Sequence, residues 1–369
     1  KGLFLMVLKF NKKVLVCAGG TGGHIFPGLA VAESLIEKGV VINWVGTKRG
    51  LEKKILEPFK IPLFFSNFKG VRGKGLVTFF TFPFNFTIAF GQAFSQLIKL
   101  RPNFVVCCGG YITVPFGLAS CLLGIPFCVV EQNAIMGTAN RILQYFAKSV
   151  YLNHKNTMHA LKTAEAVGSP IRSEFLKISP PKVGKKNTSA PFNILILGGS
   201  QGSSYLNKNL PECLKAIPEI RRKNLSIIHQ CGAGNYEEVF QLYQNTRIKV
   251  VVKPFLNKII DDYKWADLVI SRSGAGVINE ILAVGVASVL VPLPNSIDDH
   301  QRANANMIRD NNAAVVIEQG DNFKNKIVKF ITGVQLKDLS EMANRARKMS
   351  TTDASEKISK NILRLVDEK

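Results

Sequence analysis

The chain has 369 residues, of which 46% are hydrophobic, so it has enough apolar material for two packed domains and is not disordered throughout. Lys and Arg outnumber Asp and Glu by 48 to 26. The formal net charge of +22 favours an anionic partner, such as nucleic acid, acidic lipid or a phosphorylated substrate. Seven cysteines form no CxxC pair and five histidines form no HExxH pattern. We therefore expect buried free thiols and no bound metal.

The N-terminal segment KGLFLMVLKFNKK contains a short apolar run without a small-residue cleavage site, and we do not interpret it as a signal peptide. Met6 is a candidate natural start, with the residues before it as an extension. No run along the chain has the length and composition of a clean transmembrane helix.

Two segments of the chain have the same form. Lys13–Cys17 is an apolar strand that meets the glycines of AGGTGGH and then a helical pattern over Pro27–Lys38. Phe192–Leu197 meets GGSQGS and then a helical pattern over Tyr205–Ile217. Continuous apolar strands are typical of a parallel sheet that is covered on both faces. The repetition therefore predicts an α/β protein of two Rossmann-like, doubly wound domains.

The remaining elements complete these two domains. Further strands are expected near Val41–Val45, Asn103–Cys107, Phe127–Glu131, Ser226–Gln230, Ile248–Val252, Leu268–Ser271 and Ser288–Val291. The boundary is expected within Gly168–Pro191, where SPPKVGKKNTSAP indicates an exposed linker. We expect domains over 11–168 and 169–344, with a C-terminal helix over 345–369 joined to the first.

Glycine loops follow three of the predicted strands: Gly19–Gly23, Gly198–Gly202 and Cys108–Tyr111. Glycine lets backbone N–H groups approach a ligand closely, and the following helix N-terminus favours negative charge. The alternative interpretation is that each loop is only a tight turn. No GxGxxG, GxxxxGK[ST] or Asp-x-Asp pattern is present, so phosphates would be neutralised by backbone dipoles and by Arg or Lys.

Six ordered motifs resemble those of the MurG family. They are GGTGGHIFPGLAVAESL (Gly19–Leu35), EQNAIMGTAN (Glu131–Asn140), VGSPIR (Val167–Arg172), GGSQGS (Gly198–Ser203), SRSGAGVINEILAVGVASVLVPLP (Ser271–Pro294) and DDHQRANA (Asp298–Ala305). Val130 stands where the family often has His, and GVIN precedes Glu280 where a Ser- or Thr-rich stretch is more usual.

The resemblance implies a metal-independent, inverting glycosyltransferase without a cofactor, built from two domains that face a cleft (the GT-B type). Its donor would be UDP-GlcNAc, its acceptor the 4-hydroxyl of the muramoyl sugar of lipid I, and its product lipid II for peptidoglycan synthesis. The implied location is peripheral, on the cytoplasmic face of the bacterial inner membrane. The alternatives are a UDP-sugar 2-epimerase, another glycolipid-forming glycosyltransferase and, outside enzymes, a basic RNA-binding protein; we expect no nucleic-acid partner.

The resemblance also implies roles for particular residues on the donor side. Glu280 would accept hydrogen bonds from the ribose hydroxyls, Arg172 and Ser200 would meet the diphosphate, and Gln301 would read the sugar. Further donor-binding residues are expected at Thr21, Gly22, Gly23, Asn133, Gln201 and Phe255. The alternatives are a solvated Glu280, a surface salt bridge for Arg172 and a core position for Phe255. His300 either shares the role of Gln301 or is an exposed residue at the start of a helix.

On the acceptor side, Gly20, His24 and Tyr111 are expected, with Asn133 beside them. His24 is the candidate catalytic base, because an imidazole at the end of the first loop is placed to take a proton from a hydroxyl. The alternative is a structural histidine bonded within the loop. Glu131 either participates in catalysis or orients its own loop.

Leu76–Phe94 is rich in phenylalanine and follows the cations Lys69, Arg72 and Lys74. Pro83, Asn85 and Gln92 make this run a poor membrane-spanning helix. We expect an interfacial patch whose phenylalanines enter the acyl chains while the cations meet anionic headgroups. The alternative is an ordinary buried helix.

Overall fold

The computed structural model describes residues 12–48, 50–68, 76–178, 191–199 and 202–368. The chain divides into two compact units, Lys1–Arg172 with Thr352–Lys369, and Ser173–Thr351. The first break falls within the expected range of Gly168–Pro191, and the second lies after 344 because the helix over Leu336–Met349 belongs to the second unit. The linker expected over 179–190 falls outside the described residues.

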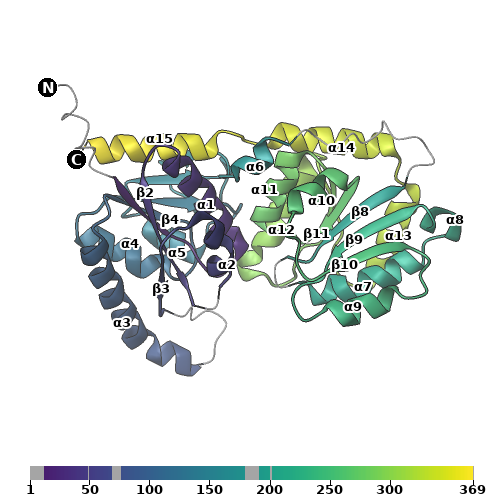
Figure 1. The fold of residues 1–369 in the computed structure, drawn as a ribbon, viewed down its shortest axis with the longest axis horizontal. Helices are drawn as coiled ribbons and strands as arrows, with labels where there is room; N and C mark the ends of the chain where they lie inside the picture. The colour runs from purple at the N-terminus through teal and green to yellow at the C-terminus, as the bar shows by residue number, and fades with distance from the viewer. Residues whose placement is uncertain (1–11, 49, 69–75, 179–190, 200–201, 369) are drawn as a thin grey trace. The chain divides into compact units, whose positions relative to one another are not determined.

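The first unit is a parallel sheet with helices on both faces (Figure 1). Its strands are β1 (Lys13–Cys17), β2 (Val41–Thr47), β3 (Leu63–Ser66), β4 (Phe104–Cys107), β5 (Phe127–Glu131), β6 (Ser149–Leu152) and β7 (Glu165–Ala166), in the order β3-β2-β1-β4-β5-β6-β7. Its helices are α1 (Gly22–Ile36), α2 (Glu52–Leu56), α3 (Leu76–Leu100), α4 (Thr113–Leu122), α5 (Thr138–Leu143) and α15 (Ala354–Asp367).

The second unit repeats this plan with the sheet order β10-β9-β8-β11-β12-β13. Its strands are β8 (Phe192–Leu197), β9 (Leu225–Gln230), β10 (Lys249–Lys253), β11 (Leu268–Ser271), β12 (Ala287–Leu290) and β13 (Val315–Val316). Its helices are α6 (Ser173–Leu176), α7 (Ser204–Lys215), α8 (Glu219–Arg222), α9 (Tyr236–Tyr243), α10 (Ile259–Trp265), α11 (Ala275–Val284), α12 (His300–Asp310), α13 (Phe323–Gly333) and α14 (Leu336–Met349). Two doubly wound parallel-sheet domains confirm the predicted fold class.

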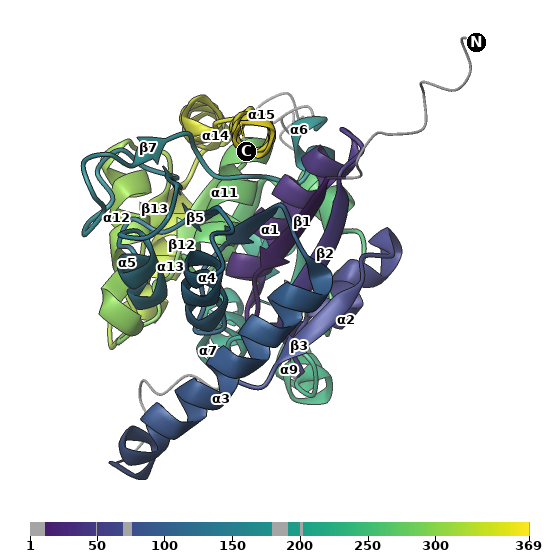
Figure 2. The same ribbon diagram turned by 90° about the vertical axis from the view of Figure 1, so that its left-hand side faces the viewer.

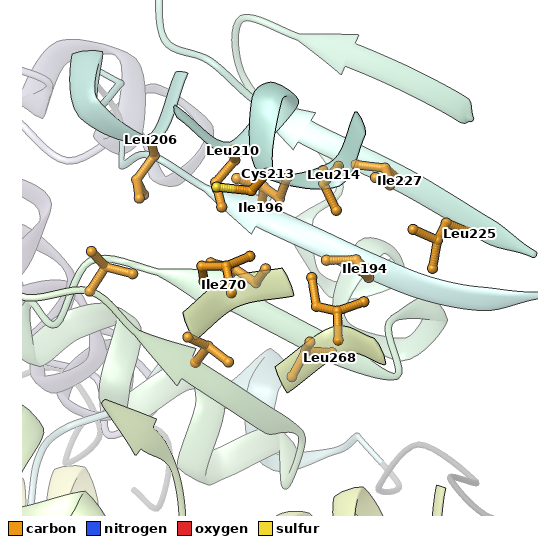
Figure 3. Close-up of a cluster of buried hydrophobic side chains, with 14 of the residues drawn as sticks. Ile194, Ile196, Leu206, Leu210, Cys213, Leu214, Leu225, Ile227, Leu268 and Ile270 are labelled. Carbon is orange, nitrogen blue, oxygen red and sulfur yellow. The ribbon is translucent and has the colours of Figure 1, made fainter. Parts of the chain in front are cut away.

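The apolar strand sequences are explained by burial on both faces of each sheet. In β1, Val14 and Val16 belong to one buried cluster, whereas Leu15 and Cys17 belong to another. Successive side chains of a strand point to opposite faces, so an unbroken apolar run is what a doubly covered strand requires. Figure 3 shows the cluster on one face of the second sheet, where Leu210 of α7 packs toward Ile196 of β8.

Helix α3 exposes several large apolar side chains, namely Phe82, Phe84, Ile88 and Ile98. Phe84 is 71% exposed and Ile88 is 51% exposed, although Ala93 and Leu97 of the same helix are buried. The N-terminal half of α3 extends beyond the rest of the first unit in both views (Figures 1 and 2). Within the described part of the chain, no helix has the length and apolar character needed to cross a membrane.

Candidate functional site

The first glycine loop, Gly19–Gly23, is held by a hydrogen bond to a buried carboxylate. Glu52, at the start of α2, is completely buried. Its Oε1 accepts hydrogen bonds from the Gly20 N–H (3.0 Å), the Thr47 N–H (2.8 Å) and the Thr47 hydroxyl (3.0 Å). The Gly20 N–H is therefore directed into the protein. The N–H groups left for a ligand in this loop are those of Thr21, Gly22 and Gly23, which open α1.

Glycine is required around this carboxylate because there is no room for a side chain. A Cβ at Gly19 would lie 2.6 Å from Oε1 of Glu52, and one at Gly46 would lie 2.7 Å from its Cγ. A Cβ at Gly50 would overlap Oε2. Three glycines therefore enclose one carboxylate, and none of the motifs found in the sequence identified Glu52.

His24 lies in the first turn of α1, and its Nδ1 is 3.0 Å from the carbonyl oxygen of Cys108. A carbonyl oxygen only accepts hydrogen bonds, so Nδ1 carries the proton. The neutral ring then has its lone pair on Nε2, the tautomer that a general base requires. Gly109 makes this approach possible, because a Cβ there would lie 2.9 Å from Nδ1. The CGGY loop therefore fixes the tautomer and orientation of His24.

Tyr111 ends the same loop and is 38% exposed. Its ring packs edge-on against the buried Phe68, with centroids 6.1 Å apart, and Phe68 in turn contacts Phe82 and Phe86 of α3. Burial and the nearby Glu52 charge raise the pKa of the Tyr111 phenol, so the group stays protonated at neutral pH. Tyr111 therefore joins the loop cluster to the helix that carries the exposed phenylalanines.

Glu131 organises the loop that follows β5, between Glu131 and Asn140. Its side chain is 2% exposed and accepts hydrogen bonds from the backbone N–H and side-chain amide of Asn133 at 3.0 and 2.9 Å. The Gly137 N–H (2.9 Å) and the Asn140 amide (2.8 Å) bind its other oxygen. Four donors on one carboxylate favour the interpretation that Glu131 orients its loop. Asn133 is fixed by the same bonds.

Arg172 lies at the end of the first unit, beside the first glycine loop. Its guanidinium carbon is 4.4 Å from the ring centroid of Phe26, a cation–π contact that holds the guanidinium beside this ring. The same ring lies close to Gly22, where a Cβ would be 2.9 Å from its Cε2 atom. Arg172 is therefore placed next to Gly22 and Gly23 through a residue that the sequence motifs did not single out.

The second glycine loop is held mainly by its backbone. Gly198 N–H donates to the Gln230 carbonyl, and Ser203 caps α7 by accepting from the Leu206 N–H. Gly202 has φ +79°, and a Cβ there would overlap the carbonyl oxygen of Cys231. Ser200 and Gln201, two of the expected donor residues, lie outside the described residues.

Glu280 lies on α11 and is only 8% exposed, so it is not a solvated residue of the helix surface. Its Oε2 accepts a hydrogen bond from the hydroxyl of Tyr263 at 3.1 Å. Helix α11 begins after the carboxyl end of β11, the region in which doubly wound domains bind their ligands.

Gln301, the second residue of α12, is tied to two loops at the same edge of the sheet. Its Oε1 accepts from the Leu293 N–H at 3.0 Å, and its carbonyl accepts from the Ser273 hydroxyl at 2.8 Å. The amide oxygen therefore orders the loop after β12, and the Nε2 side is the part suited to reading a sugar hydroxyl. His300 and Phe255 are both half-buried, and Phe255 follows β10 at this edge.

The expected site residues therefore form two groups. Gly20, Thr21, Gly22, Gly23, His24, Tyr111, Asn133 and Arg172 surround the ends of β1, β4 and β5 in the first unit. Phe255, Glu280 and Gln301 lie near the ends of β10, β11 and β12 in the second. Glu52, Phe26 and Tyr263 support them and were missed, because each acts through a contact between distant segments. In the described ranges, no cluster of three or more His, Cys, Asp or Glu is arranged to hold a metal ion.

Comparisons with known proteins agree with this division. The glycosyltransferase family 28 N-terminal domain matches residues 14–152, and the corresponding C-terminal domain matches residues 193–362. The UDP-N-acetylglucosamine--N-acetylmuramyl-(pentapeptide) pyrophosphoryl-undecaprenol N-acetylglucosamine transferase of Cupriavidus pinatubonensis is 37% identical over 348 residues, which cover 94% of this chain and 96% of that one.

Solved structures agree as well. The crystal structure of Acinetobacter baumannii MurG matches with a TM-score of 0.77 and 35% identity, covering 96% of this chain and 99% of that one. The UDP-GlcNAc 2-epimerase from Neisseria meningitidis, bound to UDP-GlcNAc, matches with a TM-score of 0.62 at 14% identity over 95% of this chain and all of that one, which shows a shared fold alone. The chain is a glycosyltransferase and belongs to the MurG family.

Proposed function

We propose that this glycosyltransferase moves N-acetylglucosamine from UDP-GlcNAc to the 4-hydroxyl of the muramoyl sugar of lipid I, giving lipid II for peptidoglycan synthesis. The donor and the undecaprenyl-linked acceptor are those in the names of relatives that match along nearly the whole chain. The observation that carries the proposal is the bond from His24 Nδ1 to the Cys108 carbonyl. It gives the first unit a base of defined tautomer in the loop cluster expected to receive the acceptor.

His24 Nε2 takes the proton of the acceptor hydroxyl as its oxygen attacks the anomeric carbon of the donor sugar. The bond from that carbon to the UDP oxygen breaks, and the configuration inverts. Because the attacking oxygen gains one bond and the departing phosphate keeps the electron pair, UDP leaves with the negative charge. Tyr111 and Asn133, fixed by Phe68 and Glu131, border the acceptor sugar.

Negative charge on the departing UDP is stabilised by Arg172 and by backbone N–H groups. The guanidinium offers a two-pronged donor to phosphate oxygens, and its contact with Phe26 lowers the side-chain entropy lost on binding. Ser200 and Gln201 are proposed at the same diphosphate, Glu280 at the ribose, Phe255 beside the uracil and Gln301 at the sugar. No metal or cofactor has a part in this scheme.

The test is release of UDP from UDP-GlcNAc in EDTA, with and without a lipid I analogue. Release that requires the analogue and persists in EDTA is expected. Conversion of the sugar without an acceptor would instead favour the epimerase reaction. Release with a diacylglycerol acceptor, but not with the lipid I analogue, would favour another glycolipid synthase.

We further propose that α3 associates with the inner membrane from the cytoplasmic side. Phe84 and Ile88 expose apolar surface, and Phe82 is 37% exposed beside them. The cations Lys69, Arg72 and Lys74 precede the helix in sequence but lie outside the described residues. Apolar side chains that insert at the interface, with cations that meet anionic headgroups, would bring the enzyme to a lipid-linked acceptor.

Vesicle flotation tests this surface with Phe84→Ser and Ile88→Ser combined, on vesicles containing an anionic phospholipid. We expect a loss of binding of about tenfold or more, because each apolar side chain contributes roughly 1–2 kcal/mol when buried. Ile220→Ser in the second unit is the matched control, since Ile220 is 89% exposed and lies on α8. Equal binding of both variants would contradict the proposal, and binding to RNA in place of vesicles would favour the nucleic-acid alternative.

A further inference from the structure

Tyr263 is a completely buried tyrosine whose hydroxyl meets the carboxylate of Glu280. The hydroxyl oxygen lies 3.1 Å from Oε2 of Glu280, and Tyr263 has no surface exposed to solvent. A buried phenol must place its O–H on a partner, and a carboxylate oxygen only accepts. The direction of the bond is therefore fixed, with Tyr263 donating to Glu280.

The ring of Tyr263 is itself held in place by Phe175 of α6. The two rings meet nearly at right angles, at 74°, with centroids 5.9 Å apart, and Phe175 is also fully buried. Helix α6 packs against α11, the helix that carries Glu280. Three separate elements thus fix the hydroxyl at one position relative to the carboxylate.

A hydrogen bond to one oxygen stops free rotation of a carboxylate about its last side-chain bond. A vicinal diol presents two O–H donors at a fixed separation, and it is bound well only by acceptor oxygens in a matching plane. We infer that Tyr263 is a positioning residue, which sets the plane of the Glu280 carboxylate for the two ribose hydroxyls of a uridine diphosphate. This inference rests on the proposed role of Glu280 in donor binding.

A positioned carboxylate also provides selectivity for ribose over deoxyribose. A site built for hydroxyl donors loses affinity when the ligand lacks them, because the buried acceptor is left unpaired. If Tyr263 acts through Glu280, removing its hydroxyl weakens UDP and leaves a ligand without the diol almost unaffected. A residue that merely supports the fold would weaken both ligands alike.

The experiment measures the dissociation constants of UDP and 2′,3′-dideoxy-UDP by calorimetry on the full chain, for the native enzyme and Tyr263→Phe. We expect Tyr263→Phe to weaken UDP about 5–20-fold and the dideoxy ligand by less than about twofold, in line with hydrogen bonds to charged groups. In turnover, KM for UDP-GlcNAc should rise by a similar factor, with kcat changed less than about twofold. Equal weakening of both ligands, or no weakening of UDP, would overturn the inference.

Tyr243→Phe is the matched control, since Tyr243 is a buried tyrosine of the same unit whose hydroxyl meets His229. It should leave the ratio of the two dissociation constants unchanged; a changed ratio would also count against the inference. Phe175→Leu keeps the Tyr263 hydroxyl but loosens its ring, so we expect a smaller loss of affinity that is specific to UDP. This variant tests the inference if Tyr263→Phe does not fold. UDP binding needs no acceptor. The two dissociation constants therefore test the role of Tyr263 even if the enzyme does not transfer the sugar to lipid I.

Discussion

The two units share a sheet order and a glycine loop after the first strand, but they hold that loop by different means. In the first unit, the side-chain carboxylate of Glu52 binds the loop at Gly20. In the second, the loop backbone packs directly on a neighbouring backbone, with Gly202 against the Cys231 carbonyl. The Asn207 amide donates to the same carbonyl at 2.8 Å. One loop depends on a carboxylate, and the other on close backbone packing.

This contrast parallels the chemistry proposed for each unit. The first unit supplies the imidazole proposed as the base, with Tyr111 and the loop held by Glu131 around it. The second unit offers rigid backbone and a buried carboxylate, which suit recognition of a nucleotide that is not itself deprotonated. Under the proposed mechanism, one topology therefore serves reaction in the first unit and nucleotide recognition in the second.

The largest expected effect comes from removing the base in the first unit. His24→Ala should lower kcat by about 10²–10⁴-fold, as expected for loss of general base catalysis, while the dissociation constant of UDP stays within about threefold. Acceptor-dependent UDP release and calorimetry measure the two quantities. His159→Ala is the control, since His159 is an exposed histidine of the same unit. A kcat near that of the native enzyme would show that His24 is only structural.

In the second unit, a side chain added at Gly202 would disrupt the backbone packing, whereas one added at Gly199 would not. Gly202→Ala should lower the free energy of unfolding by about 2–4 kcal/mol, because the new methyl meets the Cys231 carbonyl. Gly199 also has a positive φ, but a Cβ there meets nothing within 4 Å. Gly199→Ala should therefore cost only about 1–2 kcal/mol, from backbone conformation alone. Urea unfolding that gives equal losses would refute the packing argument.

Acid should weaken the second unit through His229, which is buried and bonded to Tyr243 and to the Asn207 side-chain oxygen. Burial lowers the pKa of His229 to about 3, so the folded state keeps a neutral ring while the unfolded state takes up a proton below about pH 6.5. Stability is thus fully present above that pH and is lost as the pH falls toward 3.

The expected slope from His229 is about 1.4 kcal/mol per pH unit below pH 6. His154 in the first unit contributes a similar loss, because burial lowers its pKa to about 4. The free energy of unfolding, measured in urea from pH 7 to 5, should depend less steeply on pH in His229→Gln, by the contribution of about one proton. An unchanged slope would mean that His229 takes up its proton at the same pH in the folded and unfolded states.

The smallest effect is expected at the surface ion pair that helps to attach α15 to α1. Glu356 Oε2 lies 2.6 Å from Lys38 Nζ, but the Glu356 side chain is 59% exposed. Glu356→Gln should lower the free energy of unfolding by less than about 1 kcal/mol, because solvent and salt screen such pairs. Ile362→Ala, in the buried face of the same helix, should cost about 2–5 kcal/mol by comparison. Urea unfolding of both variants measures the difference.

The sequence was sufficient for the strands and glycine loops that generate the site, because their patterns are local. Lys13–Cys17, Phe192–Leu197, Phe127–Glu131 and Leu268–Ser271 are strands with the predicted bounds. The short edge strands β7 and β13 were not predicted, since two residues carry no periodicity.

The supporting residues could not be predicted because their partners lie far along the chain. Glu52 meets Gly20, Phe26 meets Arg172 and Tyr263 meets Glu280, and none of these pairs falls within one motif. Gln301 was predicted to read the sugar, but its amide oxygen holds the Leu293 N–H, a local turn that no periodic pattern encodes.

The C-terminal helix sets an order of events during synthesis. Ile358, Ile362 and Leu365 of α15 complete the core of the first unit, and the Asn361 amide donates to the Tyr151 hydroxyl at 2.6 Å. The rest of the first unit, up to Arg172, is synthesised before the second unit, and α15 is synthesised after it. At roughly 5–20 residues per second, synthesis of the second unit alone delays the burial of the apolar face of α1 by about 10–40 s. The nascent chain therefore exposes the apolar face of α1 to chaperones until α15 has been synthesised and packs on it.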